Sequence, residues 1–343
     1  MANFATAALV KAQAKLTGRF QAGELRFRDP AVHKLFLKNT DIMIPGHMEL
    51  RTQENRTVET NYFTRTARSL GTGRSHNHTG DQGDSAILTP AWTTYNDKFV
   101  STIKEAGNSI YSLEELHLSK IENVIINFME GLETVAADFA FANRSGVNVA
   151  LVEGFFNTTD DTFEINESAD GNRAIQITRM VMDINKYQGT AYDVVCDPIA
   201  FNKFQFDAAQ GISNSTNTSF QFQGVTFVND ISLSAAASGL VASYAAGYWM
   251  AIPVGMIAAL PWIPVQNRQG EDFGNIAKFG TMINPVDGLN YALHTYNTGS
   301  DGTSLGGYTQ DVTIQTEISI DIAYEVAPLS VSTETPIMAF AFV

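Results

Sequence analysis

The sequence predicts an α+β fold, and three stretches of the chain lead to this prediction. Residues 113–143 repeat apolar side chains at helical spacing, and residues 311–326 alternate apolar and polar side chains as a long strand does. A polar, glycine-rich segment at 71–84 separates two further stretches of strand-like composition. With 343 residues, the chain is long enough to form two packed lobes.

The composition indicates a globular chain whose surface carries little charge. Hydrophobic residues make up 44% of the sequence and charged residues 17%, whereas about 25% charged residues is usual. A low charged fraction is expected where much of the surface is buried against other subunits, although a large monomeric β protein would look similar.

The net charge of −14 is unevenly distributed along the chain. Residues 1–80 carry a balance of +6, and the remaining residues carry a balance of −20. This asymmetry predicts that the basic segment lies on an acidic partner, either nucleic acid or the acidic part of a neighbouring copy. An accident of composition is the alternative explanation.

The N-terminal segment, residues 1–45, begins with a short helical pattern at Phe4–Leu16 and continues as an irregular, basic stretch. Its apolar residues do not sustain a period, so we expect an extended arm that docks on another surface. Arg19, Arg26 and Arg28 are its candidate contacts with a neighbouring subunit.

A projecting β-hairpin is expected over residues 46–104. Thr57–Arg65 and Ala86–Val100 have strand character and flank the polar tip at 71–84. A two-stranded ribbon with so few apolar residues is only marginally stable, so it is expected to lie on a neighbouring subunit.

The hairpin tip carries charged and metal-binding residue types. Arg65, Arg68 and Arg74 are candidate contacts to carboxylates of a neighbour, which we favour over DNA phosphate because the rest of the chain is acidic. Two histidines and two aspartates could gather around a metal ion, but a solvated tip is the favoured interpretation. These four residues are His76, His78, Asp81 and Asp84. A lysine cross-link from the hairpin is not expected, because no lysine occurs between Lys38 and Lys98.

A long amphipathic helix is predicted at 113–143. Ser112 and Glu115 form a capping box at its start, and Ser145-Gly146 ends it. The packing face is expected to contain Leu116, Ile121, Val124, Phe128, Leu132 and Val135. The acidic residues of the helix are expected to lie off this apolar stripe; they are Glu114, Glu122, Glu130, Glu133 and Asp138.

Shorter elements follow this helix. The expected elements are a helix at 172–187 with Ile175, Met180, Val181 and Ile184 inward, a buried strand at 192–196, a helix at 199–210 capped by Asp197, a hairpin at 220–228 and a last strand at 336–343. The uncharged stretch 231–267 is interrupted by Pro253, Pro261 and Pro264. Buried strands and turns therefore explain it better than a membrane span does.

Motifs of catalysis are missing from the sequence: it has no phosphate-binding GxxxxGK[ST] loop, no GxSxG and no HExxH. We therefore predict no catalytic residue, cofactor or metal ligand, although an enzyme whose residues converge only in the fold stays open. Cys196, the only cysteine, is expected in the core and fits folding in a reducing cytosol. The acidic residues Asp160, Asp161, Glu164 and Glu167 are expected to form a solvated face rather than a calcium site. No carboxylate partner is implied for His33, His47, His117 or His294.

The order of these elements resembles that of the major capsid proteins of tailed bacteriophages with the Hong Kong 97 fold. Residues 192–204 look like the axial strand and helix of that family, 222–228 like its next hairpin, and 309–327 like its closing strands. The resemblance divides the chain into an N-terminal arm (1–45), an E-loop hairpin (46–104), a peripheral domain with the spine helix (105–171), an axial domain (172–275) and a return to the peripheral sheet (276–343).

The resemblance implies a virion capsid protein made in the cytoplasm of a bacterial host, without a membrane. Copies would form pentamers and hexamers with axial lobes at their centres, and these would close an icosahedral shell around double-stranded DNA with little specific contact. It also implies a portal protein and allows a decoration protein. The family often carries an N-terminal scaffolding segment, but here the hairpin is expected to begin near residue 50, so a separate scaffolding protein or none is expected. An encapsulin-like shell around a cargo enzyme, a tail, baseplate or adhesin subunit, and an enzyme are the alternatives.

Overall fold

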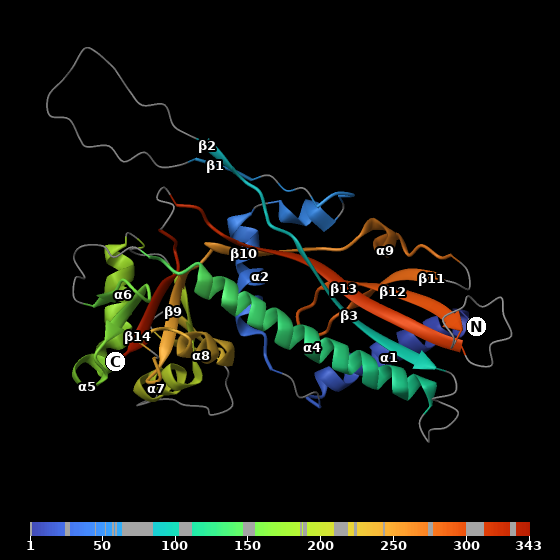
Figure 1. Ribbon diagram of the computed structural model, residues 1–343, viewed down its shortest axis with the longest axis horizontal. Helices are drawn as coiled ribbons and strands as arrows, with labels where there is room; N and C mark the ends of the chain where they lie inside the picture. The colour runs from blue at the N-terminus through green and yellow to red at the C-terminus, as the bar shows by residue number, and fades with distance from the viewer. Residues whose placement is uncertain are drawn as a thin grey trace, which may run out of the picture.

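The computed structural model contains both helices and sheets, which confirms the α+β class (Figure 1). The residues that the structure describes are 2–24, 28–44, 46–51, 53–56, 58, 60–63, 85–102, 112–146, 155–185, 187, 191–208, 219–222, 225–242, 244–273, 277–299, 312–329 and 334–343.

One sheet, here called the β13 sheet, is organised around its longest strand, β13 (Val312–Val326). β12 (Asn290–Gly299) pairs with the first half of β13 and β10 (Ile257–Trp262) with the second, while β3 (Thr93–Thr102) pairs with Thr313–Ile322 of β13. β11 (Ala277–Ile283) pairs with β12, and all these pairings are antiparallel. The alternation at 311–326 thus correctly predicted a long strand.

The hairpin expected over 46–104 is shorter than predicted in the described residues. β1 (Thr60–Phe63) and β2 (Ser85–Leu88) pair antiparallel, with Thr60 opposite Leu88. The strand character up to Val100 belongs instead to β3, which leaves the hairpin and joins the β13 sheet. Its side chains alternate between two faces, and Phe99, on the buried face, packs against His117 of the spine helix.

The spine helix α4 (Leu113–Ala142) confirms the predicted helix and its cap. The Ser112 hydroxyl accepts from the Glu115 amide, and the Glu115 carboxylate accepts from the Ser112 amide. The helix runs alongside the β13 sheet (Figure 1). Ile121, Val124, Phe128 and Leu132 are buried, Val135 packs partly buried against them and Leu116 is half-exposed. Contrary to the prediction, Glu133 lies inside the apolar stripe with none of its surface exposed.

A second sheet, here called the β9 sheet, has helices packed around it. Among the described residues its strand order is β4 (Phe156–Asn157), β5 (Thr162–Ile165), β14 (Met338–Phe342), β9 (Tyr248–Pro253), β6 (Tyr192–Cys196), β8 (Val225–Asn229) and β7 (Ser219–Phe222). The associated helices are α5 (Glu167–Asp170), a 3-10 turn at Gly171–Arg173, α6 (Ala174–Ile184), α7 (Pro198–Ala208) and α8 (Ile231–Ser238). The predicted strand, helix and hairpin between residues 192 and 229 are confirmed, with the Asp197 carboxylate accepting from the Ala200 amide.

Strand pairing joins parts of the chain that are far apart in sequence. β4 and β5 belong to the β9 sheet. β14 lies between β5 and β9, and β10 pairs with β13. The division of the chain into arm, E-loop, peripheral and axial segments stays a prediction. β9 and β10 are both apolar strands joined by a short turn, and only their partners tell them apart.

The core of the β9 sheet is built from aromatic side chains. Trp249 is fully buried, and its ring lies 4.6 Å from that of Phe342, 5.1 Å from that of Phe204 and 5.7 Å from that of Phe340, measured between centroids. On α6 the prediction was wrong for Met180, which is 43% exposed. Ile177, Thr178 and Val181 face inward instead, with Ile175 and Ile184 partly buried.

The N-terminal segment is helical, not an extended arm. α1 (Ala2–Gln21) packs against α4, and α2 (Ala31–Met43) packs between α4 and β10. Val32, Leu35 and Phe36 are buried at helical spacing, followed one turn later by buried Asn39 and Thr40. These two polar residues hide the period in the sequence. Their side chains bond the backbone of Gly255 and Ala259, so α2 can be buried here.

Two smaller elements complete the described chain, a 3-10 helix at His47–Arg51 (η1) and α9 (Val265–Gln269). The uncharged stretch forms the buried strands β9 and β10, as predicted. Among the helices described, none has the length and apolar character needed to cross a membrane.

Candidate assembly surfaces and the junction between the sheets

The β1–β2 hairpin projects from the body of the molecule (Figure 1). In the described residues its two strands pair with each other and with neither larger sheet. Ile87 on β2 is 57% exposed. Such a ribbon has no core of its own and gains stability by lying on another surface. The hairpin residues Arg65, Arg68, Arg74, His76, His78, Asp81 and Asp84 lie outside the described residues, so their predicted roles stay predictions.

The basic N-terminal helix lies on acidic residues of the spine helix in the same chain. Ala12 and Leu16 are buried at the α1–α4 contact, and Arg19 Nη1 lies 2.5 Å from Glu122 Oε2. The Ser112 amide and hydroxyl, which donate to the Glu115 carboxylate, lower the pKa of Glu115, and the charge of Lys15 adds to this effect. Part of the positive charge of the N-terminal segment is thus paired with acidic residues of the same chain. The predicted contact of Arg19 with a neighbour stays a prediction.

The Arg19–Glu122 pair provides a test of how α1 is held. Arg19→Glu is expected to raise the protease sensitivity of α1 and to lower stability by about 1 kcal/mol, because it replaces attraction by repulsion at a partly exposed site. Limited proteolysis of the full chain measures this. The charge-swapped pair Arg19→Glu with Glu122→Lys is expected to restore resistance; equal sensitivity of both variants would contradict the contact.

Arg28 links the segment before α2 to the start of α8. Its guanidinium contacts the Asp230 carboxylate and the Ser232 hydroxyl, and Asp230 caps α8 by accepting from the Ser232 amide at 2.9 Å. The Asp230 side chain has no exposed surface and that of Arg28 is 25% exposed. Arg28 was predicted to contact a neighbouring subunit. The partners seen here lie in its own chain, and the predicted contact of Arg28 with a neighbour stays a prediction. Arg26 lies outside the described residues.

His33 belongs to a buried network that the sequence analysis missed. Its Nδ1 lies 2.8 Å from the Tyr324 hydroxyl, and its Nε2 lies 3.9 Å from Asp287 Oδ2. Tyr291 donates to the same Asp287 oxygen at 2.6 Å. Burial lowers the pKa of His33 to about 3, with a further contribution from the charge of Lys34, so the ring is neutral at physiological pH. No local pattern links residues this far apart in sequence.

The acidic residues at 160–167 form the predicted solvated face only in part: Glu167 is exposed and pairs with Lys203, whereas Asp160 and Glu164 are held by other groups of the chain. Asp160 is buried and accepts from the Val241 and Ala242 amides at 3.1 and 3.0 Å. Glu164 accepts from the Tyr244 hydroxyl and from the Asn157 amide group. The carboxylates of Asp160 and Glu164 therefore already accept hydrogen bonds from other groups of the chain. In the part of the chain that the structure describes, no three His, Cys, Asp or Glu side chains are grouped to hold a metal.

Cys196 is buried in β6, as predicted for a core residue. Burial raises its pKa well above the ordinary value, and the charge of Asp197 adds to the effect. The thiol therefore stays protonated and is a poor nucleophile.

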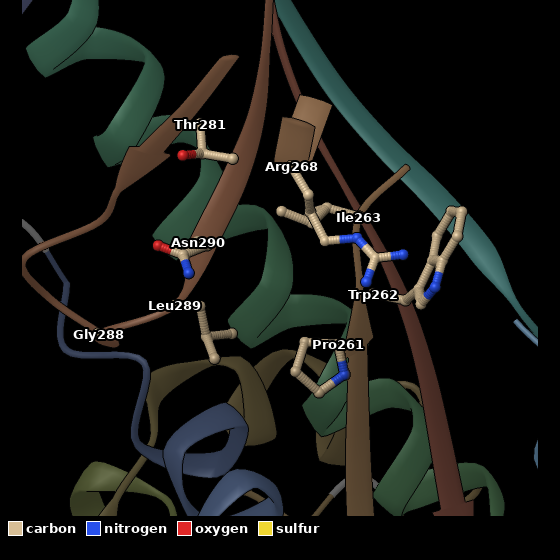
Figure 2. Close-up of a pocket in the computed structure, with 8 residues that line it drawn as sticks. All are labelled: Pro261, Trp262, Ile263, Arg268, Thr281, Gly288, Leu289 and Asn290. Atoms are coloured by element: carbon tan, nitrogen blue, oxygen red, sulfur yellow. The ribbon is translucent and has the colours of Figure 1, made fainter. Parts of the chain in front are cut away.

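A cavity of about 290 Å³ lies beside β10 (Figure 2). Its described lining residues are Pro261, Trp262, Ile263, Arg268, Thr281, Gly288, Leu289 and Asn290. Arg268 points toward Trp262, with its guanidinium carbon 5.8 Å from the ring centroid, and donates to the Gln53 carbonyl. Arg268 is the charged residue among these, so the lining pairs no acid with a base.

A neighbouring cavity of about 440 Å³ shares Pro261, Gly288 and Leu289 with the first. His47 Nε2 lies 3.2 Å from Asp41 Oδ1 in its lining. The nearby Thr40 hydroxyl bonds the Phe36 and Ala259 carbonyls, so it is not directed at the histidine as a nucleophile would be.

Helix α7 is apolar on two faces. Ala200, Phe201 and Phe204 are buried against the β9 sheet, while Ile199 is 51% and Phe206 72% exposed on the other side. Ile199 and Phe206 lie seven residues apart and therefore share one helix face. An exposed apolar face of this kind is typical of a surface that contacts another protein.

The comparisons with known proteins identify the fold. No protein-family model and no curated protein matches the sequence. Among solved structures, a chain of the cyanophage Pam1 capsid asymmetric unit is similar to 89% of this chain over 90% of its own length, with 11% identity and a TM-score of 0.51. The mature capsid of bacteriophage PhiM1 (84% and 82% covered, 12% identity, TM-score 0.46) and the capsid of cyanophage A-1(L) (84% and 88%, 12%, 0.47) are also similar.

The match to the Pam1 capsid chain covers 89% of this chain and 90% of that chain. An identity of 11% leaves no side-chain detail to transfer, so the shared property is the fold. The chain therefore has the fold of a phage capsid chain, as its resemblance to the Hong Kong 97 capsid proteins predicted.

Proposed function

We propose that this chain is a major capsid protein whose copies assemble into a closed shell around double-stranded DNA. The observation that carries the proposal is the similarity to the Pam1 capsid chain over 89% of the sequence. The role is structural, and copies would meet in pentamers and hexamers of an icosahedral virion capsid.

Two surfaces support assembly from copies of one chain. The β1–β2 hairpin projects without a core of its own, which suits a segment that lies on a neighbour. The exposed face of α7, with Ile199 and Phe206, lies on the lobe of the β9 sheet, at the opposite end of the molecule from the tips of β11 and β12 (Figure 1). In the proposed shell this lobe would take the axial position at the centre of a ring, as the resemblance to the capsid family implies. Many moderate contacts of this kind close a shell cooperatively.

The proposal is tested by the mass and shape of the purified protein. Light scattering with negative-stain images is expected to show closed particles of megadalton mass, or rings of five and six copies. A monodisperse monomer or dimer, unchanged when a scaffolding protein is co-expressed, would exclude the assembly. Nuclease-protected DNA inside the particles supports a phage capsid, whereas an enclosed protein cargo supports an encapsulin-like shell.

Phe206→Glu tests the α7 face directly. Burying a phenylalanine side chain contributes about 2 kcal/mol per contact, and a charge in its place adds a desolvation cost at every equivalent contact in a shell. We expect particles to be lost while the far-UV circular dichroism and melting temperature of the unassembled chain stay close to wild type. Phe206→Leu is the matched control and is expected to assemble. Normal particles from Phe206→Glu would show that this face is not a contact.

A further inference from the structure

The first turn of α2 is capped by a side chain from another helix. Pro30, at the N-cap position, makes no side-chain capping bond. Instead, the Val32 amide donates to Glu133 Oε1 and the His33 amide to Glu133 Oε2, both at 3.0 Å. Glu133 comes from the middle of α4, so α2 depends on the spine helix to satisfy its first amides.

Asp230 meets Glu133 at this point from the β9 sheet. Its Oδ1 accepts from the Ser232 amide and contacts Arg28, whereas its buried Oδ2 has no hydrogen-bond partner among the described residues. Burial raises the pKa of both carboxyl groups, and the charge of Asp230 raises that of Glu133 further, whereas a side-chain hydrogen bond with Glu133 lowers that of Asp230. Of the two groups, Glu133 is therefore the one that holds the proton. One guanidinium cannot neutralise two buried carboxylates, and an uncompensated buried charge is costly. A single proton between the two groups removes this charge and provides Oδ2 with a donor.

The titratable groups around Glu133 and Asp230 do not change the net charge of this pair. His33 faces the cluster from α2 and is neutral because burial lowers its pKa to about 3. Tyr324 faces it from β13, and burial raises its pKa well above the ordinary value, so it is neutral too. Beyond His33 lie Asp287, whose pKa burial raises, and Lys34, which pairs with Asp29 at 2.6 Å.

We propose that Glu133 and Asp230 share one proton that holds the start of α2 against α4 and α8, and that losing this proton at alkaline pH releases it. The protonated acid still accepts from the α2 amides while it donates to Asp230. Two carboxylates in the same place repel each other across the contact between α4 and α8. The start of α2, which is tied to both through Glu133 and Arg28, is the element that opens.

The direction of the pH effect follows from the raised pKa of Glu133. Burial, followed by the charge of Asp230, raises it from an ordinary 4.5 to about 8, even though the α2 amides oppose the shift. The folded state therefore holds this proton more tightly than the unfolded state. The stabilisation is complete below about pH 4.5 and is lost as the pH rises through about 8.

Hydrogen–deuterium exchange on the full chain tests the proposal, whether or not copies form a shell. Exchange of the α2 amides, corrected for the intrinsic effect of pH, is expected to accelerate about tenfold per pH unit above pH 8, because one proton is released. Amides in the middle of α4 are expected to keep their protection. Unchanged corrected exchange of α2 between pH 7 and pH 9.5 would overturn the proposal.

Asp230→Asn is the decisive variant, because its oxygen still accepts from the Ser232 amide while its nitrogen, in the place of Oδ2, donates to the Glu133 carboxylate, and the substitution removes one of the two charges. We expect it to keep α2 protected at pH 9.5. Glu133→Gln also removes one charge, but its nitrogen cannot accept from one of the two α2 amides, so it is expected to abolish the pH dependence while raising α2 exchange at every pH. Glu130→Gln, on the exposed side of α4, is the matched control and is expected to show the wild-type acceleration. Acceleration in both Glu133→Gln and Asp230→Asn equal to that of wild type would exclude the shared proton.

Discussion

Replacing Trp249 with alanine is expected to lower the free energy of unfolding by about 4 kcal/mol, which is typical for the removal of a fully buried aromatic side chain. Trp249 has no exposed surface and contacts Phe204, Phe340 and Phe342, so its removal leaves a cavity bordered by three rings. The Trp249 Nε1 group also donates to the buried Thr178 hydroxyl at 3.0 Å, and this bond is lost.

Urea unfolding of the unassembled full chain measures this effect. Trp262→Ala is the matched control, because Trp262 is partly exposed in the β13 sheet and its removal is expected to cost clearly less. If both variants lost the same free energy of unfolding, Trp249 in the β9 sheet would be no better packed than Trp262 in the β13 sheet. Trp249→Phe separates packing from the hydrogen bond, since it keeps a ring and loses the donor.

Arg28→Ala is expected to destabilise the chain by about 3 kcal/mol, because removing one partner of a buried ion pair leaves the other charge uncompensated. Asp230 is fully buried at the start of α8, and Arg28 is the cation that contacts it among the described residues. The loss is expected to appear in the isolated subunit, as a lower melting temperature and urea midpoint.

Two further variants test whether the loss of stability in Arg28→Ala comes from the uncompensated charge of Asp230. Arg28→Ala combined with Asp230→Asn is expected to recover part of the stability, because the remaining cap is neutral. Arg173→Ala is a control with almost no effect, since Arg173 is 73% exposed and lies 3.7 Å from Asp170. If Arg28 instead served only a neighbouring subunit, Arg28→Ala would leave the isolated chain unchanged and impair assembly alone.

The candidate surfaces were only partly predictable. Arg28 was identified from its charge, but its partners Asp230 and Ser232 in the same chain were not, because a charge shows that a partner exists without showing which residue supplies it. Phe206 was missed, although the sequence holds a signal for it. A helix with Ile199 and Phe206 on one face and Phe201 and Phe204 on the other is apolar on two sides. Such a helix needs two partners, and the β9 sheet is only one of them.

Local patterns in the sequence were sufficient for the elements whose hydrogen bonds are local. The capping box at Ser112 and Glu115 and the apolar stripe behind it determined α4, and the alternation of residues 312–326 determined β13. A helix bonds to itself four residues away, and a strand shows its two faces at every second residue, so both leave a record in the nearby sequence.

Only the tertiary structure decided which elements meet. The periods of β10 and β14 show that each is apolar, but not that β10 joins β13 while β14 joins β9. Likewise, Glu133 interrupts an apolar stripe, and nothing near it in sequence shows that the amides of α2 make its burial possible. Periodicity in the sequence shows which face of a helix or strand is apolar and therefore buried. The partner that covers this face, and the donors that satisfy a polar group within it, come from distant parts of the chain.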